Sequence, residues 1–240
     1  MYQQAQVEEE RRVWGAKPQL RVLKQDYYAQ IRSLLPRGGR VVELGSGCGG
    51  LKESMPEVIA SDLFPTPWVD VALAAQAIPF ADSSIDALVG LDVLRHLEEP
   101  LSFFREAARV LRPGGKIILL DPYVSVGSWL SWHYIHHEGC SLQESFDFSR
   151  PFPAENNARA TLWFDRNRLR MEEMIRPLRI ERTKTLDLFY YPLTGGFRPW
   201  ALVPAAVAPA MLRADRWLER WFGKWLGYRM LIVMRKEGTR

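Results

Sequence analysis

The chain has 240 residues, of which 47% are hydrophobic and 25% charged, and its formal net charge at pH 7 is +4. This length accommodates one α/β domain with added cap segments. The positive charge is small and spread along the chain, so it does not indicate a nucleic-acid partner. Two cysteines favour a reducing compartment over a disulfide framework. No apolar run is long enough for a secretory signal or a membrane span, and we expect a cytoplasmic protein.

Two amphipathic segments precede the first predicted strand. Residues 3–14 and 19–35 have apolar side chains at helical spacing. In the second segment, Leu20, Tyr27 and Ile31 are expected to pack on a sheet, with a contribution to a substrate entrance as the alternative. Residues 1–39 are therefore predicted as N-terminal helices.

The most informative segment runs from Arg40 to Gly50. An apolar strand at residues 41–44 leads into a turn that contains Gly45, Gly47, Gly49 and Gly50. Such a turn brings backbone amides close to a ligand as the chain enters a helix. Glu43 places a carboxylate near the end of the apolar strand, where burial without a partner is costly. This favours a nucleoside ligand that carries a cationic group.

A second acidic residue follows the next predicted strand. Residues 58–61 are apolar or small, and Asp62 comes directly after them, 19 residues beyond Glu43. A carboxylate at this place can accept hydrogen bonds from both ribose hydroxyls of an adenosine-type ligand. The two acids alone fit NAD and S-adenosylmethionine equally well.

Three further motifs distinguish these ligands. They are Ile78-Pro79-Phe80 followed by Ser84-Ile85-Asp86, then Leu94-Arg95-His96-Leu97, and then Arg109-Val110-Leu111-Arg112-Pro113-Gly114-Gly115. In this order, and with the glycine turn before them, they closely resemble the class I S-adenosylmethionine-dependent methyltransferases, specifically the type 11 group. The resemblance covers Arg40 to Pro122. It implies an α/β fold with a Rossmann-like, seven-stranded, mostly parallel sheet, helices on both faces, and S-adenosyl-L-methionine as cofactor.

The resemblance also implies a set of cofactor contacts. Glu43 faces the methionine end, Asp62 binds the ribose, Leu63 packs on the adenine and Leu91 lies beneath the methyl donor. The turn residues Gly45, Ser46 and Gly47 lie against the cofactor, and the backbone of Ala75 and Gln76 meets the adenine edge. Many relatives have an acid where this chain has Ala74, and Asp70 is the nearest acid. We favour the backbone of Ala75 and Gln76, together with the Gln76 side chain, for holding the adenine.

The chain is predicted to be one methyltransferase domain over residues 1–240. Residues 40–122 form the cofactor-binding core, and 178–188 and 228–236 form the last two strands as an antiparallel pair. The intervening segments 123–177 and 189–227 are cap insertions that project over the carboxyl edge of the sheet. We expect both caps to build the acceptor pocket.

Three histidines in the first cap are candidates for catalysis. His133, His136 and His137 lie in an aromatic segment, and histidine is suited to remove a proton from an acceptor near neutral pH. A structural role in shaping the cap is the alternative. The neighbouring Glu138 is misplaced for a zinc motif and no third ligand is evident, so no metal is predicted.

The segment 204–226 permits two interpretations. Trp217, Trp221 and Trp225 recur every four residues, with arginines and a lysine between them. The favoured interpretation is a cap helix that buries its aromatic side chains on the domain or on a second subunit. The alternative is an interfacial helix that makes peripheral contact with a membrane.

The sequence as a whole predicts an S-adenosylmethionine-dependent methyltransferase. O-methylation is favoured, with a small-molecule, glycan-like or lipid-linked acceptor. The alternative is a regulatory pseudoenzyme that binds S-adenosylmethionine without transfer activity. The sequence leaves the acceptor and the oligomeric state open.

Overall fold

The computed structural model describes residues 4–134, 140–144, 146–149, 151–152 and 156–238. Its centre is a seven-stranded sheet in the order β3-β2-β1-β4-β5-β7-β6, which confirms the predicted architecture. The strands are β1 (Val41–Leu44), β2 (Ile59–Asp62), β3 (Val71–Ala72), β4 (Ile85–Leu91), β5 (Leu111–Pro122), β6 (Leu178–Leu186) and β7 (Arg229–Lys236). The first five run parallel, and β7 is antiparallel to both β5 and β6.

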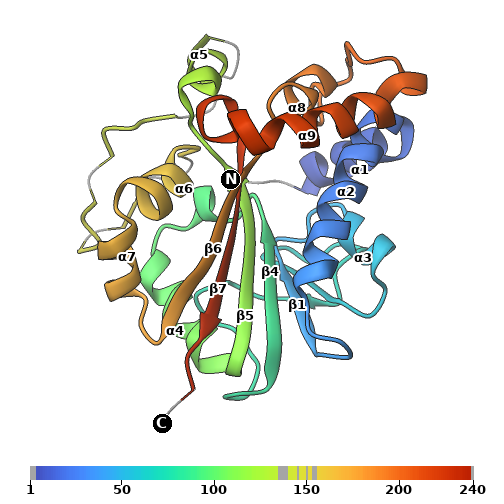
Figure 1. The fold of residues 1–240 in the computed structure, drawn as a ribbon. Helices are drawn as coiled ribbons and strands as arrows, with labels where there is room; N and C mark the ends of the chain where they lie inside the picture. Colours follow the sequence, from blue (N-terminus) through green and yellow to red (C-terminus); the bar gives the residue numbers. More distant parts are fainter. Residues whose placement is uncertain (1–3, 135–139, 145, 150, 153–155, 239–240) are drawn as a thin grey trace.

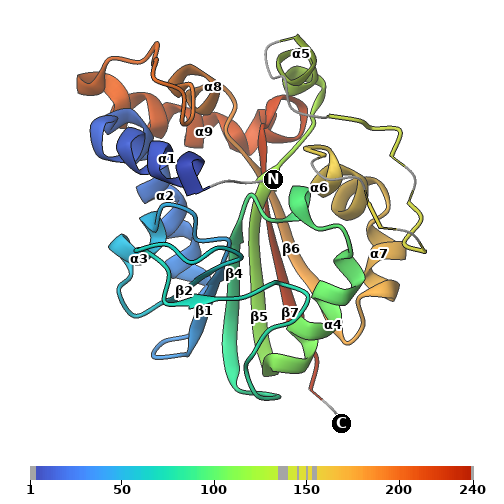
Figure 2. The same ribbon diagram turned by 180° about the vertical axis from the view of Figure 1, so that it is seen from behind.

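Helices cover both faces of the sheet (Figures 1 and 2). The helical elements are α1 (Gln4–Ala16), α2 (Pro18–Leu34), α3 (Gly50–Ser54), η1 (Leu94–His96), α4 (Pro100–Val110), α5 (Val126–Tyr134), α6 (Arg159–Thr161), η2 (Leu162–Arg166), α7 (Arg168–Met174), α8 (Tyr190–Thr194), η3 (Ala205–Val207) and α9 (Ala208–Leu226). Helices α1–α3 lie to one side, and α4, α6 and α7 lie to the other. Helices α5, α8 and α9 gather beyond the carboxyl ends of the parallel strands.

The two-residue alternation of β5 divides the core between these faces. Ile117 and Leu119 pack with the aromatic residues of α4, whereas Ile118 and Leu120 pack with the apolar residues of α2. Because successive side chains of a strand point to opposite faces, one buried strand supplies both layers. The two core layers therefore hold the sheet between the helices on either side, and with it the carboxyl edge that carries the candidate functional residues.

Helix α9 differs from one form of the favoured prediction, burial of its aromatic side chains on the domain, whereas burial on a second subunit stays a prediction. Trp217, Trp221 and Trp225 are 56%, 71% and 63% exposed, so the expectation that they are buried on the domain is wrong. The buried side of the helix instead carries Asp215 and Glu219. No described helix is long and apolar enough to cross a membrane.

The backbone that follows β6 explains this orientation. Glu219 accepts a hydrogen bond from the Asp187 amide (2.8 Å), and Asp215 accepts from the amides of Leu188 (3.0 Å) and Tyr190 (2.9 Å). Buried amides require acceptors, and the two carboxylates supply them. A Cβ at Gly223 would lie 2.6 Å from Thr185 Oγ1, so a glycine permits this close approach of helix and strand.

Candidate cofactor and acceptor site

The turn between β1 and α3 has the backbone geometry that its glycines allow. Gly45, Gly47 and Gly49 adopt φ angles of 66°, 50° and 75°. These left-handed conformations strain any residue with a Cβ. A Cβ at Gly49 would also lie 2.6 Å from Trp68 Cβ. The turn is therefore restricted to glycine by conformation and by space.

Glu43 is buried beside this turn with an unsatisfied oxygen. Its side chain lies on β1 and is 3% exposed. Within the described part of the chain, neither its Oε2 atom nor Ser46 Oγ has a hydrogen-bond partner beyond this pair of side chains. Burial raises the pKa of Glu43 to about 7. Because a buried carboxylate without a partner is costly, these atoms fit a ligand that brings a cationic donor.

Asp62 stands at the end of β2 and faces the same turn. Its Oδ2 atom accepts a hydrogen bond from the Gly47 amide at 2.9 Å. The next residue, Leu63, is 61% exposed and presents an apolar surface beside it. The structure thus brings Asp62 and Leu63 together with Gly45, Ser46 and Gly47 at one edge of the sheet.

The other predicted cofactor contacts lie on neighbouring segments. Ala75 and Gln76 are half-buried in a turn closed by the bridge between Ala74 and Ala77. Asp70 binds Lys52 Nζ (2.6 Å) and the Ala60 amide (2.8 Å), so its carboxylate is already engaged. This engagement agrees with our preference for the backbone at residues 75–76. Leu91 is half-buried at the end of β4.

Helix α1 covers the outer side of the glycine turn. Arg11 Nη1 donates to the Cys48 carbonyl (3.2 Å) and pairs with Glu53 (2.8 Å). Trp14 Nε1 also donates to Glu53 at 3.0 Å. The N-terminal helices therefore reach the predicted cofactor region as well as packing on the sheet.

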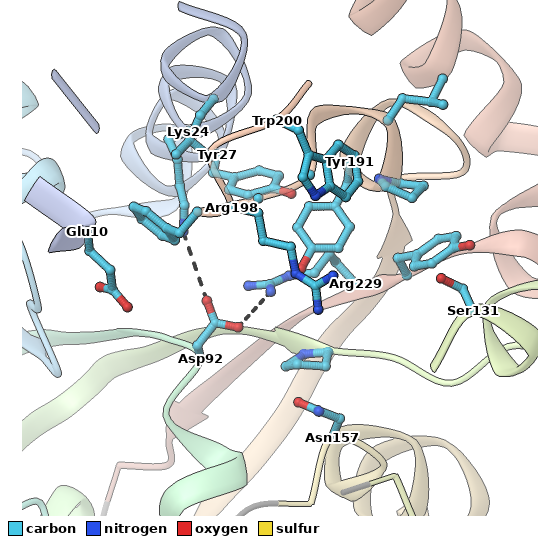
Figure 3. A pocket seen from close by; sticks show the side chains of 18 of the residues that line it. Glu10, Lys24, Tyr27, Asp92, Ser131, Asn157, Tyr191, Arg198, Trp200 and Arg229 are labelled. Carbon is cyan, nitrogen blue, oxygen red and sulfur yellow. Dashed lines mark hydrogen bonds and ion pairs between the residues drawn. The ribbon is translucent and has the colours of Figure 1, made fainter. Parts of the chain in front are cut away.

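A cavity of about 800 Å³ opens at the same edge, between α2, α5 and the segment 191–202 (Figure 3). Its wall includes the aromatic residues Tyr27, Tyr191, Phe197, Trp200 and Tyr228. Pockets for organic ligands are commonly concave and largely apolar, with a few polar groups that fix orientation. The second N-terminal helix was predicted to pack on the sheet, with a contribution to the substrate entrance as the alternative. Leu20 and Tyr27 of α2 do both, because they are buried and also line this cavity.

Asp92 anchors the charged floor of the cavity. It follows β4 with a φ angle of 64°, and its Oδ1 lies 2.6 Å from Arg229 Nη1. Its Oδ2 lies 3.9 Å from Lys24 Nζ (Figure 3). Burial alone would raise the pKa of Asp92, but Arg229 and Lys24 hold it well below its usual range. Asp92 therefore stays anionic and is unsuited to accept a proton from an acceptor.

Arg198 supplies a cation without a carboxylate. Its side chain points into the cavity in Figure 3, and it forms no ion pair with any residue that the structure describes. The segment that carries it is held by Lys17, whose Nζ donates to the carbonyls of Gly196, Arg198 and Trp200, each at 2.8 Å. The cavity thus combines an aromatic wall with a positioned, uncompensated guanidinium.

Asp121 is a second buried carboxylate, at the end of β5. Its Oδ1 accepts from the Leu94 amide (2.8 Å), and its Oδ2 has no partner among the described residues. Burial, and then repulsion from Asp92, raises the pKa of Asp121 to about 7. Glu43 and Asp121 are therefore alike: each is a buried carboxylate at this edge with an unsatisfied oxygen and a raised pKa.

Two of the three predicted catalytic histidines lie outside the residues that the structure describes. His136 and His137 lie outside the described residues, and of His133 only its position in the last turn of α5 is described. The beginning of that helix lines the cavity through Gly127, Leu130 and Ser131. Among the described residues, no group of three or more potential metal ligands occurs.

Sequence reasoning missed the charged floor of the cavity. Lys24, Asp92, Arg198 and Arg229 come from four separate segments and show no common spacing. Asp92 alone had a usable signal, because it follows a strand as Asp62 does. Arg159 is buried close to this edge, and it donates to the carbonyls of Leu94, Arg95 and Leu97 and so supports η1.

Comparison with known proteins gives the family context. Residues 42–119 match the family model described as a methyltransferase domain. A dimethylglycine N-methyltransferase from Parasynechococcus marenigrum is 28% identical over 114 residues, which cover 39% of this chain and 41% of that protein. A ubiquinone biosynthesis O-methyltransferase from Xanthomonas axonopodis pv. citri is 32% identical over 105 residues, which cover 36% of this chain and 44% of that protein. The match spans less than half the length of each curated relative.

The fold comparison extends over more of the chain. Geranyl diphosphate C-methyltransferase from Streptomyces coelicolor A3(2), solved with Mg²⁺, geranyl diphosphate and S-adenosyl-L-homocysteine, is similar with a TM-score of 0.52. The similarity covers 89% of this chain and 81% of that one, at 14% sequence identity. At this identity the likeness concerns the fold. In sequence, residues 42–119 match a methyltransferase domain, and over most of the chain the fold is similar to that of a solved methyltransferase.

Proposed function

We propose that this chain transfers a methyl group from S-adenosylmethionine to an oxygen atom of an anionic, partly apolar acceptor. The observation that carries the proposal is the buried Glu43 carboxylate, which has an unpartnered oxygen beside a turn that only glycine can form. The sulfonium of the cofactor supplies the activated methyl group. The alternative of a regulatory pseudoenzyme gains no support from the comparisons.

The residues present fit the cofactor. Glu43 and Ser46 would receive its amino-acid end, because their orphaned oxygens need donors. Asp62 would accept from the ribose while it continues to hold the Gly47 amide, and exposed Leu63 would pack against the adenine. The work of these side chains is to bind and orient, which contributes strongly to catalysis when the reacting atoms must lie in line.

The acceptor side of the proposal rests on the cavity. Arg198 would pair with a carboxylate or phosphate of the acceptor, and Tyr191, Phe197 and Trp200 would contact its apolar part. Of the three acceptor classes that the sequence left open, an amphiphilic, lipid-linked molecule fits this lining best. The similar proteins include methyltransferases for nitrogen, oxygen and carbon, and our preference for oxygen is the one made from the sequence.

Proton removal depends on which oxygen reacts. A carboxylate oxygen carries no proton at neutral pH and needs no base, whereas a hydroxyl does. For a hydroxyl acceptor we retain His133, His136 and His137 as the proposed source of the base, because they follow the part of α5 that lines the cavity. Asp92 is excluded from this role by its pairing with Arg229.

Calorimetric titration with S-adenosylmethionine, S-adenosylhomocysteine and NAD tests the cofactor. We expect micromolar binding of the first two and none of the third. Turnover to S-adenosylhomocysteine is then measured with amphiphilic carboxylates, phosphorylated lipids and neutral sugars. Binding without turnover on any anionic acceptor would support the pseudoenzyme, and binding of NAD alone would refute the assignment of the cofactor.

A further inference from the structure

Helix α9 exposes a continuous aromatic stripe, which we call the tryptophan face. It consists of Trp217, Trp221 and Trp225, whose four-residue spacing places them along one side of the helix. A soluble protein rarely exposes three tryptophans in a row, and a large exposed apolar patch commonly marks a docking surface. The acids that would balance a solvated helix, Asp215 and Glu219, are turned inward.

A basic stripe runs beside the tryptophan face. Arg213, Arg220 and Lys224 are separated by seven and four residues, so they also share one side of the helix. All three are exposed, and none forms an ion pair with any residue between positions 4 and 238 that the structure describes. Three solvated cations beside three tryptophans are typical of a helix that lies at a membrane interface.

The apolar surface continues onto α5, which leads to the cavity. Val126, Trp129 and Leu130 of α5 are 73%, 40% and 56% exposed. The two helices are in contact, since a Cβ at Gly127 would lie 2.6 Å from Leu226 Cδ2 and 3.3 Å from the Trp225 carbonyl oxygen. Gly127 and Leu130 also line the cavity. The tryptophan face and the cavity entrance are therefore connected by one helix, at the end of the molecule where α5 and α9 meet (Figure 1).

We propose that the tryptophan face and its basic stripe dock this protein on an anionic lipid bilayer, with the cavity entrance close to the membrane. Charge complementarity selects this occupant. A symmetric dimer through the same face would bring the basic stripes of two copies together, which is unfavourable. A bilayer that contains anionic lipids attracts the same cations and accepts the tryptophans at the level of its headgroups. This proposal does not depend on the methyl-transfer assignment.

Vesicle flotation of the full-length chain tests the proposal. Binding is measured to phosphatidylcholine alone and to phosphatidylcholine with phosphatidylglycerol, at low and high salt. The charge variant is Arg220→Glu/Lys224→Glu, and its control is Arg37→Glu/Arg105→Glu, which has the same net charge but alters exposed residues far from α9. The apolar variant is Trp217→Gln/Trp221→Gln/Trp225→Gln, and its control is Leu169→Gln on α7, where Leu169 is 78% exposed.

We expect binding to the anionic vesicles, weakened by salt and lost in the tryptophan variant. The charge variant should bind at least about 25-fold more weakly, from roughly five-fold for each of the two basic residues removed, and the two added carboxylates weaken binding further. Both controls should bind like the unmodified chain, and circular dichroism confirms that each variant is folded. Failure to bind anionic vesicles, or equal weakening by the control pair, would overturn the proposal. A dimer in solution that the tryptophan variant dissociates would assign the face to a second copy instead.

Discussion

The two halves of the carboxyl edge, one beside β1 and the other beside β4 and β7, differ in how the buried carboxylates of Glu43 and Asp92 are paired. Beside β1, Glu43 Oε2 and Ser46 Oγ have no hydrogen-bond partner beyond this pair among the described residues. Beside β4 and β7, Asp92 is neutralised by Arg229 at 2.6 Å, and Lys24 lies nearby. In the first half, no described cation forms an ion pair with Glu43 and Lys24 acts on it only at longer range, whereas in the second half Arg198 has no carboxylate partner among the described residues.

This difference indicates what each half is prepared to receive. A site that lacks a cation gains most from a ligand with an amino or sulfonium group, because the ligand completes the electrostatics. The second half also keeps an unpartnered carboxylate oxygen, on Asp121, but the carboxylate of Asp92 that lines the cavity is paired with Arg229, so the cavity favours an anion at the Arg198 guanidinium. The edge therefore distinguishes a cationic cofactor from an anionic acceptor.

The largest effect is expected for Asp62→Ala. Removal of this carboxylate deletes the proposed ribose contacts and the acceptor of the Gly47 amide. A loss of about 2–4 kcal/mol corresponds to a roughly 30- to 1000-fold higher Kd for S-adenosylmethionine by calorimetry. The control is Asp70→Ala, which alters an acid of the neighbouring strand that is engaged by Lys52. Equal losses in both variants would mean that Asp62 acts only through the stability of the strands.

The next effect compares Glu43→Gln with Asp121→Asn. Burial raises both pKa values to about 7, so the folded state holds these protons more tightly than the unfolded state does. Each group therefore lowers stability progressively as pH rises from its ordinary pKa to about 7, and the loss is complete above that value. Each variant should be more stable than the unmodified chain at about pH 8, by on the order of 3 kcal/mol, and little changed at about pH 4.

Cofactor binding separates these two variants. Glu43→Gln should lose affinity for S-adenosylmethionine, because the neutral amide cannot pair with a cationic group. Asp121→Asn should keep it, because Asp121 lies in the half of the edge that contains Asp92 and Arg229. Urea unfolding at both pH values and calorimetric titration measure the two properties. If Asp121→Asn also abolished binding, the division of the edge into two halves would be wrong.

Local patterns predicted the cofactor half of this edge better than the acceptor half. Residues 41–62 combine a strand, a glycine turn and two acids within a short stretch, so spacing alone placed Glu43 and Asp62 on one edge. The parallel strands were also predictable from the alternation of strands and helices, whereas the antiparallel direction of β7 followed from the family resemblance. The cofactor role of these residues stays a prediction until binding is measured.

The acceptor half depends on contacts between distant segments. Asp92 and Arg229 are 137 positions apart, and Lys17 reaches carbonyls more than 170 positions away. The spacing of residues along the sequence does not reveal contacts between positions so far apart. The prediction that α9 buries its tryptophans on the domain was wrong for a related reason. Asp215 and Glu219 on its buried face accept hydrogen bonds from backbone amides after β6, and the hydrophobic pattern of the helix does not reveal this. Polar demands of a neighbouring segment thus overrode the usual preference to bury tryptophan.

A smaller effect is expected for Arg198→Gln, once an acceptor is identified. Loss of a charge-assisted hydrogen bond at a half-buried site should raise the acceptor KM about ten-fold, and the Kd of S-adenosylmethionine should not change. The control is Arg105→Gln, an exposed arginine on α4. The comparison between a neutral and an anionic form of the same acceptor is decisive. The KM of the anionic form should be higher for the Arg198→Gln variant than for the unmodified chain, and the KM of the neutral form should be the same for both.

The smallest effect is expected for Lys17→Met, which removes the support behind Arg198. The Lys17 ammonium donates to three carbonyls of the segment 196–200, and water can replace part of this solvation because Trp200 is exposed. We expect a loss of about 1–2 kcal/mol in the free energy of unfolding and a roughly three-fold higher acceptor KM. Lys236→Met is the control, since Lys236 donates to a single carbonyl, that of Leu111, far from the cavity. If both variants lose stability but only Lys17→Met raises the acceptor KM, the segment 196–200 positions Arg198, and its rigidity belongs to the acceptor half of the edge.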